Sequence, residues 1–409
     1  MTTELRMLRP EEWDGWFGKV ELAFGGVGEA PEERVLWQQL TEAERSIAAW
    51  DEGEIVGTAG AFSFGLTVPG GASVPAAGVT MVSVQPTHRR RGVLRSMMRR
   101  QLDDVRERGE ALAVLTASEG SIYGRFGYGA ATLEMRLDVD TLRLAPPDVP
   151  GADGVRLRLA DPAKALADCE RVYARTVAAR PGMLARQPGW EQLAVLDPER
   201  ERNGKGRLQC VLAEVDGEVR GYARYAVEPR WNSEGAHGTV RLQHIAAPDP
   251  EVYAALWRYL FGIDLTSSVA AHNLPVDDPV LHLVADMRRC GIRLRDDAYV
   301  RTVEVGAALA ARTYQRPVDV VLEVSDAFCP WNEGRWRLTG DERGAVCERT
   351  TEAPGLALSA RELGSAYLGG FTLSELAAAG RVRELRPGAL RAASVAFASD
   401  VAPWLPHGF

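Results

Sequence analysis

The apolar and polar positions in the first 140 residues change from a strand period to a helix period and back. Residues 46–63, SIAAWDEGEIVGTAGAFS, have the pattern of two strands joined by a turn at 51–54. The run VTMVSV at 79–84 predicts a further strand, which ends before Pro86 because proline has no N–H for a ladder hydrogen bond. From Val93 onward apolar residues recur at helical spacing, so an amphipathic helix is expected next.

The same alternation continues after this helix. ALAVLT at 111–116 is a continuous apolar run typical of a buried strand. The glycine-rich stretch SEGSIYGRFGYG at 118–129 predicts a loop with a short helix, and TLEMRLDV at 132–139 predicts another strand. The predicted order is strand, loop, helix, strand, short helix, strand.

A second copy of this pattern follows a proline-rich segment at 145–154, APPDVPGADG, which we interpret as a linker. Residues 216–225, DGEVRGYARY, repeat the order of residue types at 52–61, EGEIVGTAGA, and 239–262 again have the pattern of strand, loop and amphipathic helix. Chance similarity of two short hairpins is the alternative to an internal duplication. At the position of the first copy's arginines, the second copy carries Asp249 and Glu251, which would repel an anion.

The last hundred residues have a different character. Strands are expected at 299–305 and 318–324, a hairpin in RWRLTGD and AVCERT, and short helices in SARELGSAYLGG and TLSELAAAG. We therefore predict an α/β (α+β) chain of three domains, at 1–145, 151–297 and 298–409, which agrees with what 409 residues normally form.

Composition limits the possible classes. The chain has 46% hydrophobic and 25% charged residues and a net charge of −8, so it is globular and lacks the basic excess of a nucleic-acid binder. Its five cysteines have no metal-ligand spacing, so we expect reduced thiols, no metal and a cytoplasmic location. The N-terminus has no signal-peptide pattern. Prolines and glycines divide the uncharged stretch 55–87, so no membrane span is expected.

The sequence Arg89-Arg90-Arg91-Gly92-Val93-Leu94 lies between a predicted strand and a predicted helix. It has three interpretations: a nucleic-acid patch, a solvated charge run, or a loop that binds phosphate. The negative net charge of the chain weakens the interpretation as a nucleic-acid patch. The position of the loop between a strand and a helix weakens the interpretation as a solvated charge run, because the free N–H groups and the dipole of a helix N-terminus attract phosphate. The loop does not match the Walker or dinucleotide patterns. It resembles the Arg-x-x-Gly-x-Gly/Ala loop of GNAT acetyltransferases, with Leu94 in place of the small last residue.

The resemblance becomes specific when this loop is taken with TASEGSIYGRFGYGAAT, the duplicated middle, DAFCPWNEGRWRL and the terminal Phe409. Together they resemble the Eis (enhanced intracellular survival) family of N-acetyltransferases over essentially the whole chain. The resemblance implies a catalytic GNAT domain, a second, degenerate GNAT-like domain and a sterol-carrier-like domain, assembled as a homohexamer. It also implies acetyl-CoA as cosubstrate, with these contact residues: Val82, Ser83, Val84, Arg90, Arg91, Gly92, Val93, Leu94, Arg95, Ser118 and Glu119.

The family's general acid corresponds to Tyr123, with Tyr128 as a rival on sequence alone, and its general base corresponds to the α-carboxylate of Phe409. His88 is another conceivable base, but a residue inside the phosphate loop is poorly placed to reach the acceptor amine, so we interpret it as structural or as a loop contact. The expected function is acetyl transfer to primary amines of cationic, polyamine-type substrates, such as aminoglycosides at one or several positions, or lysine side chains. Acidic and aromatic candidates for the pocket border are Glu29, Glu32, Glu33 and Trp37, although a solvated helix face explains the glutamates equally well. A non-catalytic protein that binds CoA and lipid is the alternative.

Overall fold

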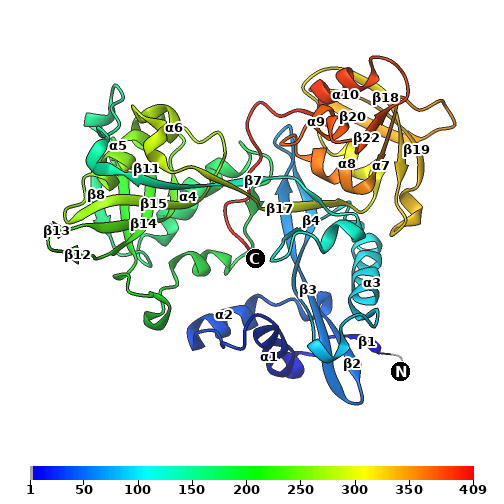
Figure 1. Cartoon of the computed structure of the whole chain (residues 1–409), viewed down its shortest axis with the longest axis horizontal. Helices are drawn as coiled ribbons and strands as arrows, with labels where there is room; N and C mark the ends of the chain where they lie inside the picture. The colour runs from blue at the N-terminus through cyan, green and yellow to red at the C-terminus, as the bar shows by residue number, and fades with distance from the viewer. Residues whose placement is uncertain (1–2) are drawn as a thin grey trace. The chain divides into compact units, whose positions relative to one another are not determined.

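The computed structural model describes residues 3–409, which form two compact units. Of the described residues, the first unit contains 3–133, 180–187 and 296–409, and the second contains 134–179 and 188–295. Each unit is built from mixed sheets with helices against their faces (Figure 1).

An eight-stranded sheet forms the base of the first unit. Seven strands lie in the order β1 (Glu4–Met7), β2 (Ile47–Asp51), β3 (Glu54–Thr67), β4 (Ser73–Val84), β5 (Leu112–Thr116), β17 (Ala298–Thr302) and β6 (Gly129–Ala130), and β9 (Leu184–Ala185) pairs with β3. Among the described strands of this sheet, β4 and β5 are the one parallel pair, because the helix between them returns the chain to the end of the sheet at which β4 begins.

Helices α1 (Trp13–Ala23), α2 (Pro31–Leu40) and α3 (Val93–Glu107) lie against this sheet, and α8 (Ala360–Tyr367) packs on its strands β17 and β6. Helix α3 begins at Val93, the residue at which the apolar period predicts a helix. Its buried face contains Met97, Met98 and Leu102, and Gln101 donates a hydrogen bond from Nε2 to the backbone oxygen of Gly60 at 2.9 Å. Burial of this apolar face, about 25 cal/mol for each Å², holds α3 on the sheet.

The first unit also contains the C-terminal part of the chain, which has its own five-stranded sheet. Its strands lie in the order β20 (Gly344–Arg349), β19 (Gly334–Asp341), β18 (Val318–Ser325), β21 (Leu356–Ser359) and β22 (Val382–Glu384). Four helices accompany it: α7 (Val305–Ala310), α8 (Ala360–Tyr367), α9 (Leu373–Ala378) and α10 (Ala389–Phe397). Strands and short helices thus occur where the sequence pattern predicts them.

The second unit has a seven-stranded sheet. The strands lie in the order β16 (Arg293–Asp296), β7 (Leu133–Asp140), β15 (Thr266–Leu274), β14 (Gly238–Ala246), β11 (Glu218–Glu228), β10 (Gln209–Val215) and β8 (Arg156–Ala160). Its helices are α4 (Leu166–Val177), α5 (Pro250–Phe261) and α6 (Val280–Leu283), and a separate short hairpin is formed by β12 (Trp231–Asn232) and β13 (Gly235–Ala236).

The two copies of the predicted hairpin have the same turn geometry. Glu52 and Gly53 between β2 and β3 have φ of 50° and 83°, and Asp216 and Gly217 between β10 and β11 have φ of 50° and 80°. Two successive left-handed residues are the signature of a tight hairpin turn that matches the twist of its strands. The sequence repeat therefore corresponds to a structural repeat.

Two strands join sheets that the chain order does not indicate. β7, which pattern alone groups with the strands before it, pairs with β15 of the second unit. β17, which pattern alone groups with the C-terminal strands, lies between β5 and β6 of the first unit. Within residues 3–409, no helix is long and apolar enough to cross a bilayer.

Candidate active site

The parallel strands β4 and β5 separate along their length. Ala76 to Gly78 of β4 pair with Leu112 to Val114 of β5, and in the described chain no pairing between these strands continues beyond Gly78. Met81 has φ of 51°, at a register irregularity between β3 and β4. The Thr58 hydroxyl bonds both Met81 O and the Ser83 hydroxyl at 2.7 Å, which fixes this bulge. The backbone of Val82, Ser83 and Val84 therefore lies on the part of β4 that has left β5.

The arginine loop follows directly. Arg90 has φ of 62° and Gly92 has φ of 86°, and Gly92 is the residue before the first turn of α3. Among the described residues no side chain caps this helix, whose first intrahelical bond from this end runs from Ser96 N to Gly92 O at 3.0 Å. The N–H groups of Val93, Leu94 and Arg95 thus remain for a ligand.

Charge reinforces this helix end. Arg89, Arg90, Arg91 and Gly92 are all exposed. A helix N-terminus with several guanidinium groups is suited to bind a phosphate or pyrophosphate. His88 lies beside the loop, and its Nε2 is 3.0 Å from Oδ2 of Asp51 in the β2–β3 hairpin, which agrees with the structural role predicted for it.

The corresponding helix end in the second unit has the opposite charge. Asp249 is the residue before the first turn of α5, and both its carboxylate oxygens accept hydrogen bonds from Arg220 at 3.0 Å. A carboxylate already paired at this position leaves no place for a phosphate. Of the two copies, the first alone has the features of an anion site.

Tyr123 begins the short helix η4 (Tyr123–Phe126), and Ser118 and Glu119 lie exposed in the loop between β5 and this turn. Burial, assisted by the negative charge of Glu119, raises the pKa of Tyr123 to about 12. The phenol therefore keeps its proton at neutral pH. Its ring meets the ring of Tyr128 edge-on, with centroids 6.0 Å apart.

Tyr128 has a different environment. Its side chain is fully buried, and its hydroxyl has no hydrogen-bond partner in the described structure. Burial raises the pKa of Tyr128 far above its usual value. Tyr123 is only partly buried, so of the two phenols it is the one that a ligand can reach.

The last residue lies against β4, next to Thr80 and just beyond Gly78, where the pairing of β4 with β5 ends. The Thr80 hydroxyl donates a hydrogen bond to a main-chain oxygen of Phe409 at 3.0 Å. The Phe409 ring packs on Phe64, with centroids 5.0 Å apart. Gly78 leaves room for both rings, since a Cβ there would lie 2.4 Å from the ring of Phe64 and 3.1 Å from that of Phe409. The end of the chain is thus anchored beside the strand split.

A row of aromatic rings extends from this anchor to α2. Phe64 neighbours Phe62 at 6.0 Å, and Phe62 neighbours Trp37 at 6.2 Å. Trp37 donates from Nε1 to Glu33 at 3.3 Å, whereas Glu29 is exposed and its N–H donates to Glu21. Of the predicted pocket residues, Trp37 therefore forms one end of this aromatic row and Glu33 contacts it there.

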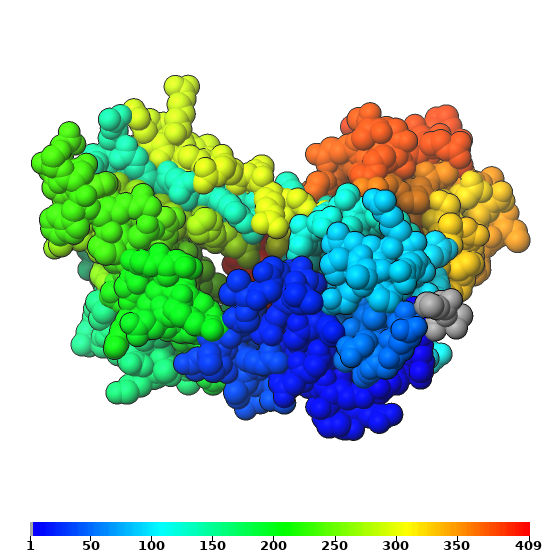
Figure 2. Space-filling view, turned by 60° about the horizontal axis from the view of Figure 1, so that its bottom comes forward, coloured from blue at the N-terminus to red at the C-terminus, as the bar shows by residue number. Residues whose placement is uncertain are grey.

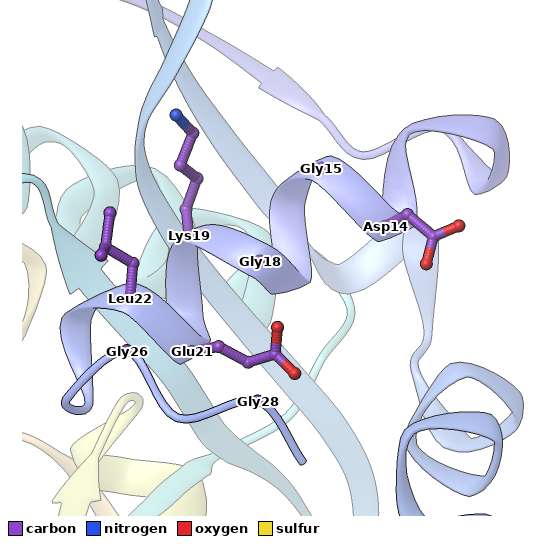
Figure 3. A pocket seen from close by; sticks show the side chains of 8 residues that line it. All are labelled: Asp14, Gly15, Gly18, Lys19, Glu21, Leu22, Gly26 and Gly28. Carbon is purple, nitrogen blue, oxygen red and sulfur yellow. The ribbon is translucent and has the colours of Figure 1, made fainter. Parts of the chain in front are cut away.

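A shallow hollow beside α1 is a separate feature of the first unit. Its lining residues are Asp14, Gly15, Gly18, Lys19, Glu21, Leu22, Gly26 and Gly28 (Figure 3). Both of its carboxylates already pair with Arg34, Asp14 at 3.1 Å and Glu21 at 2.7 Å. We assign no ligand to it.

The C-terminal part of the first unit supports the site through the segment DAFCPWNEGRWRL, to whose Phe328 the sequence analysis gave no role. The Phe328 ring lies under the guanidinium groups of Arg95, at 5.5 Å, and Arg99, at 4.1 Å, and its centroid is 5.0 Å from that of Phe126 in η4. Figure 2 shows the pale-blue surface near α3 next to the yellow surface of this segment. Phe328 thus contacts both the arginine helix and the turn that carries Tyr123.

This segment is held by a buried ion pair. Arg301 on β17 donates to Asp326 at 2.6 Å, and both side chains are almost fully buried. Asp326 also accepts hydrogen bonds from Cys329 N at 2.9 Å and Asn332 Nδ2 at 3.0 Å. Removing one partner of such a pair leaves a buried charge, at a cost of about 3–5 kcal/mol.

The predicted contact residues thus fall into three groups at one end of the β4–α3–β5 unit: the open strand edge, the arginine loop, and the loop after β5. Thr80 and Phe328 were missed by sequence reasoning. A threonine inside a strand and a phenylalanine in a loop carry no local signal, and their partners lie 329 and about 200 residues away.

Comparison with known families agrees with this geometry. Residues 4–131 and residues 182–302 each match the family described as "Acetyltransferase (GNAT) domain", and residues 305–406 match "Sterol carrier protein domain". The chain is therefore a GNAT-type acetyltransferase with tandem GNAT domains and a C-terminal sterol-carrier-like domain. GNAT acetyltransferases use acetyl-CoA.

Similar proteins narrow the class. An "Uncharacterized N-acetyltransferase" of Streptomyces avermitilis is 64% identical over 409 residues, the whole of both chains. "N-acetyltransferase Eis" of Mycobacterium tuberculosis is 36% identical over 98% of both chains. The crystal structure of Eis1 from Mycobacterium abscessus covers 100% of both chains, with a TM-score of 0.86 and 35% identity. The chain belongs to the Eis family of N-acetyltransferases.

The predictions of family, fold class and enzyme class are confirmed by these comparisons. The comparisons favour an acyltransferase over the alternative of a non-catalytic protein that binds CoA and lipid.

Proposed function

We propose that the protein transfers acetyl from acetyl-CoA to primary amines of cationic, polyamine-type substrates, such as aminoglycosides at one or several positions, or lysine side chains. The observation that best supports this proposal is the anchoring of Phe409 by Thr80 on β4. A main-chain terminus held where the strands separate supplies a carboxylate beside the proposed thioester position.

In this proposal acetyl-CoA lies along the split between β4 and β5. The backbone of Val82 to Val84 pairs with the amides of the pantetheine arm, as an added strand would. The loop Arg90–Arg95 binds the pyrophosphate through its N–H groups and guanidinium groups. Ser118 and Glu119 complete the site. The uncapped start of α3 and the left-handed Arg90 and Gly92 support this assignment.

The reaction is a direct transfer. The amine nitrogen attacks the thioester carbonyl carbon, a C–N bond forms, and the C–S bond breaks. The Phe409 carboxylate takes a proton from the amine, directly or through water, and Tyr123 gives its proton to the departing sulfur. Because the pKa of Tyr123 is raised to about 12, its phenol is protonated at neutral pH and can act as the acid. Desolvation of the thiolate in the same site increases its affinity for that proton.

The acceptor amine is proposed to approach along the aromatic row from Trp37 to Phe409. A cation near the face of an aromatic ring gains about 0.5–2 kcal/mol, depending on how far it is desolvated. Glu33, bonded to Trp37, supplies negative charge at the far end of this row. Glu29 and Glu32 are exposed, and a solvated helix face accounts for them equally well.

We further propose a homohexamer, as the family resemblance implies, and the three domains 1–145, 151–297 and 298–409 that the sequence pattern predicts. Light scattering coupled to size-exclusion chromatography tests the assembly.

The experiment that tests the function is a turnover screen with aminoglycosides, polyamines and lysine peptides, each with acetyl-CoA. CoA release gives the rate, and product mass gives the number of acetyl groups added. We expect CoA release with several polyamines and mass increases of one or more acetyl groups. Tight acetyl-CoA binding without release of CoA for any amine would contradict the proposal.

A further inference from the structure

A short segment, Arg180–Gln187, belongs to the first unit although the residues on both sides of it belong to the second. It is attached to β3 in two ways. β9 pairs with Gly65 and Leu66, and Thr67 exchanges backbone hydrogen bonds of 2.8 Å with Met183 O and Gly182 N. The segment therefore adds a strand to the catalytic sheet, next to the rings of the aromatic row.

The same segment contacts the last residues of the chain. Trp404 N donates to Pro181 O at 2.9 Å, and Arg180 donates to Ala402 O. Gly182 has φ of 92°, and a Cβ there would lie 2.8–3.1 Å from the backbone of Trp404. The chain end thus crosses the segment so closely that glycine is required.

Two side-chain contacts in series connect this segment with the last residues of the chain. Arg186 donates from Nε to His407 Nε2 at 3.3 Å, and His407 Nδ1 lies 3.2 Å from Gly408 O. A carbonyl only accepts, so in this arrangement Nδ1 is the donor to Gly408 O and Nε2 is the acceptor from Arg186. Arg186 therefore orients an imidazole that holds the peptide group directly before Phe409.

We propose that segment 180–187 positions the Phe409 carboxylate, with Arg186 as a positioning residue that acts through His407. This inference rests on the proposed function, because it presupposes that the carboxylate takes part in turnover.

The test uses Arg186→Met, which keeps the aliphatic stem and removes the donor. We expect kcat to fall about tenfold, as the loss of one orienting hydrogen bond suggests, with KM for acetyl-CoA unchanged. Carboxypeptidase A gives a readout independent of catalysis. It should release phenylalanine from the variant several times faster than from the wild type. Arg156→Met, which removes a surface partner of Glu214 in the second unit, is the control and should behave as wild type in both assays.

Two further variants make the result specific. His407→Leu should reproduce both effects, and the double variant should be no worse than the more affected single variant, because both residues act on one contact. A wild-type rate of phenylalanine release from Arg186→Met overturns the inference, whatever its turnover. A chain extended by two glycines beyond Phe409 separates this failure from that of the proposed function. If the extension abolishes turnover while Arg186→Met is unaffected in both assays, only the positioning role is wrong.

Discussion

Thr80→Val removes the hydroxyl that bonds Phe409 and leaves a side chain of nearly the same shape. Valine is favoured in strands, so β4 should keep its structure. A hydrogen bond to a charged group contributes about 1.5–3 kcal/mol, and Thr80 is only partly buried, so we use the lower value. If the loss of this hydrogen bond raises the activation free energy by about 1.5 kcal/mol, kcat falls about tenfold. KM for acetyl-CoA should not change, since Thr80 is not among the proposed contact residues for acetyl-CoA.

The assay is CoA release at saturating acetyl-CoA and polyamine, with thermal unfolding measured in parallel. Thr239→Val is a matched control, because Thr239 is also a strand threonine, bonded to Ser268 in the second unit at 2.9 Å. Both variants should unfold within a few degrees of the wild type. A Thr80→Val enzyme with wild-type kcat would refute the reasoning that this contact holds a working base.

Five other predictions concern the site. Tyr123→Phe should lower kcat by about 10²-fold or more with KM for acetyl-CoA unchanged. Tyr128→Phe should keep kcat and raise stability by about 1 kcal/mol, because it deletes a buried hydroxyl without a partner. Since burial raises the pKa of Tyr123 to about 12, the acid remains protonated as pH rises from 7 to 10.5, and kcat should show no alkaline decline in that range. Arg90→Gln should raise KM for acetyl-CoA about tenfold and leave kcat nearly unchanged. Phe328→Leu should lower kcat/KM for acetyl-CoA severalfold, because it loosens both the arginine helix and the turn of Tyr123.

Steady-state kinetics and denaturant unfolding check these expectations. Equal effects of the two tyrosine variants on kcat would remove Tyr123 from its proposed role. An alkaline limb below pH 9.5 would show that the acid titrates much lower than its burial implies. An Arg90→Gln enzyme with unchanged KM would place the pyrophosphate elsewhere. Phe397→Leu, a core change beside Tyr314, is the control for Phe328→Leu and should leave kcat/KM unchanged.

Local elements could be predicted because their signals are local. The start of α3 at Val93 follows from its apolar period and from Gly92, and the end of β4 follows from Pro86. The paired hairpins were visible as a repeat because tight turns demand the same residue types in both copies.

The assignment of strands to sheets was not predictable in this way. β7 and β17 have ordinary strand patterns, and nothing in such a pattern records which sheet edge the strand will join. The same limit applies to the buried pair of Arg301 and Asp326, since each residue alone has the character of a surface charge.

Of the candidate site, the arginine loop was proposed from one sequence motif, and Tyr123 and Phe409 were proposed through family resemblance. The contacts of Phe409 with Thr80 and Phe64 depend on the path of the whole chain. They became apparent only with the fold.

The most direct test of the account is the turnover of a chain extended by two glycines after Phe409. The extension replaces the carboxylate at this position with a neutral peptide group and leaves every side chain in place. We expect acetyl-CoA to bind with wild-type affinity, measured by calorimetry, and CoA release with a polyamine to fall by at least about 10²-fold, the usual contribution of a general base. Unchanged CoA release in the extended chain would contradict the central claim that the Phe409 carboxylate is the base.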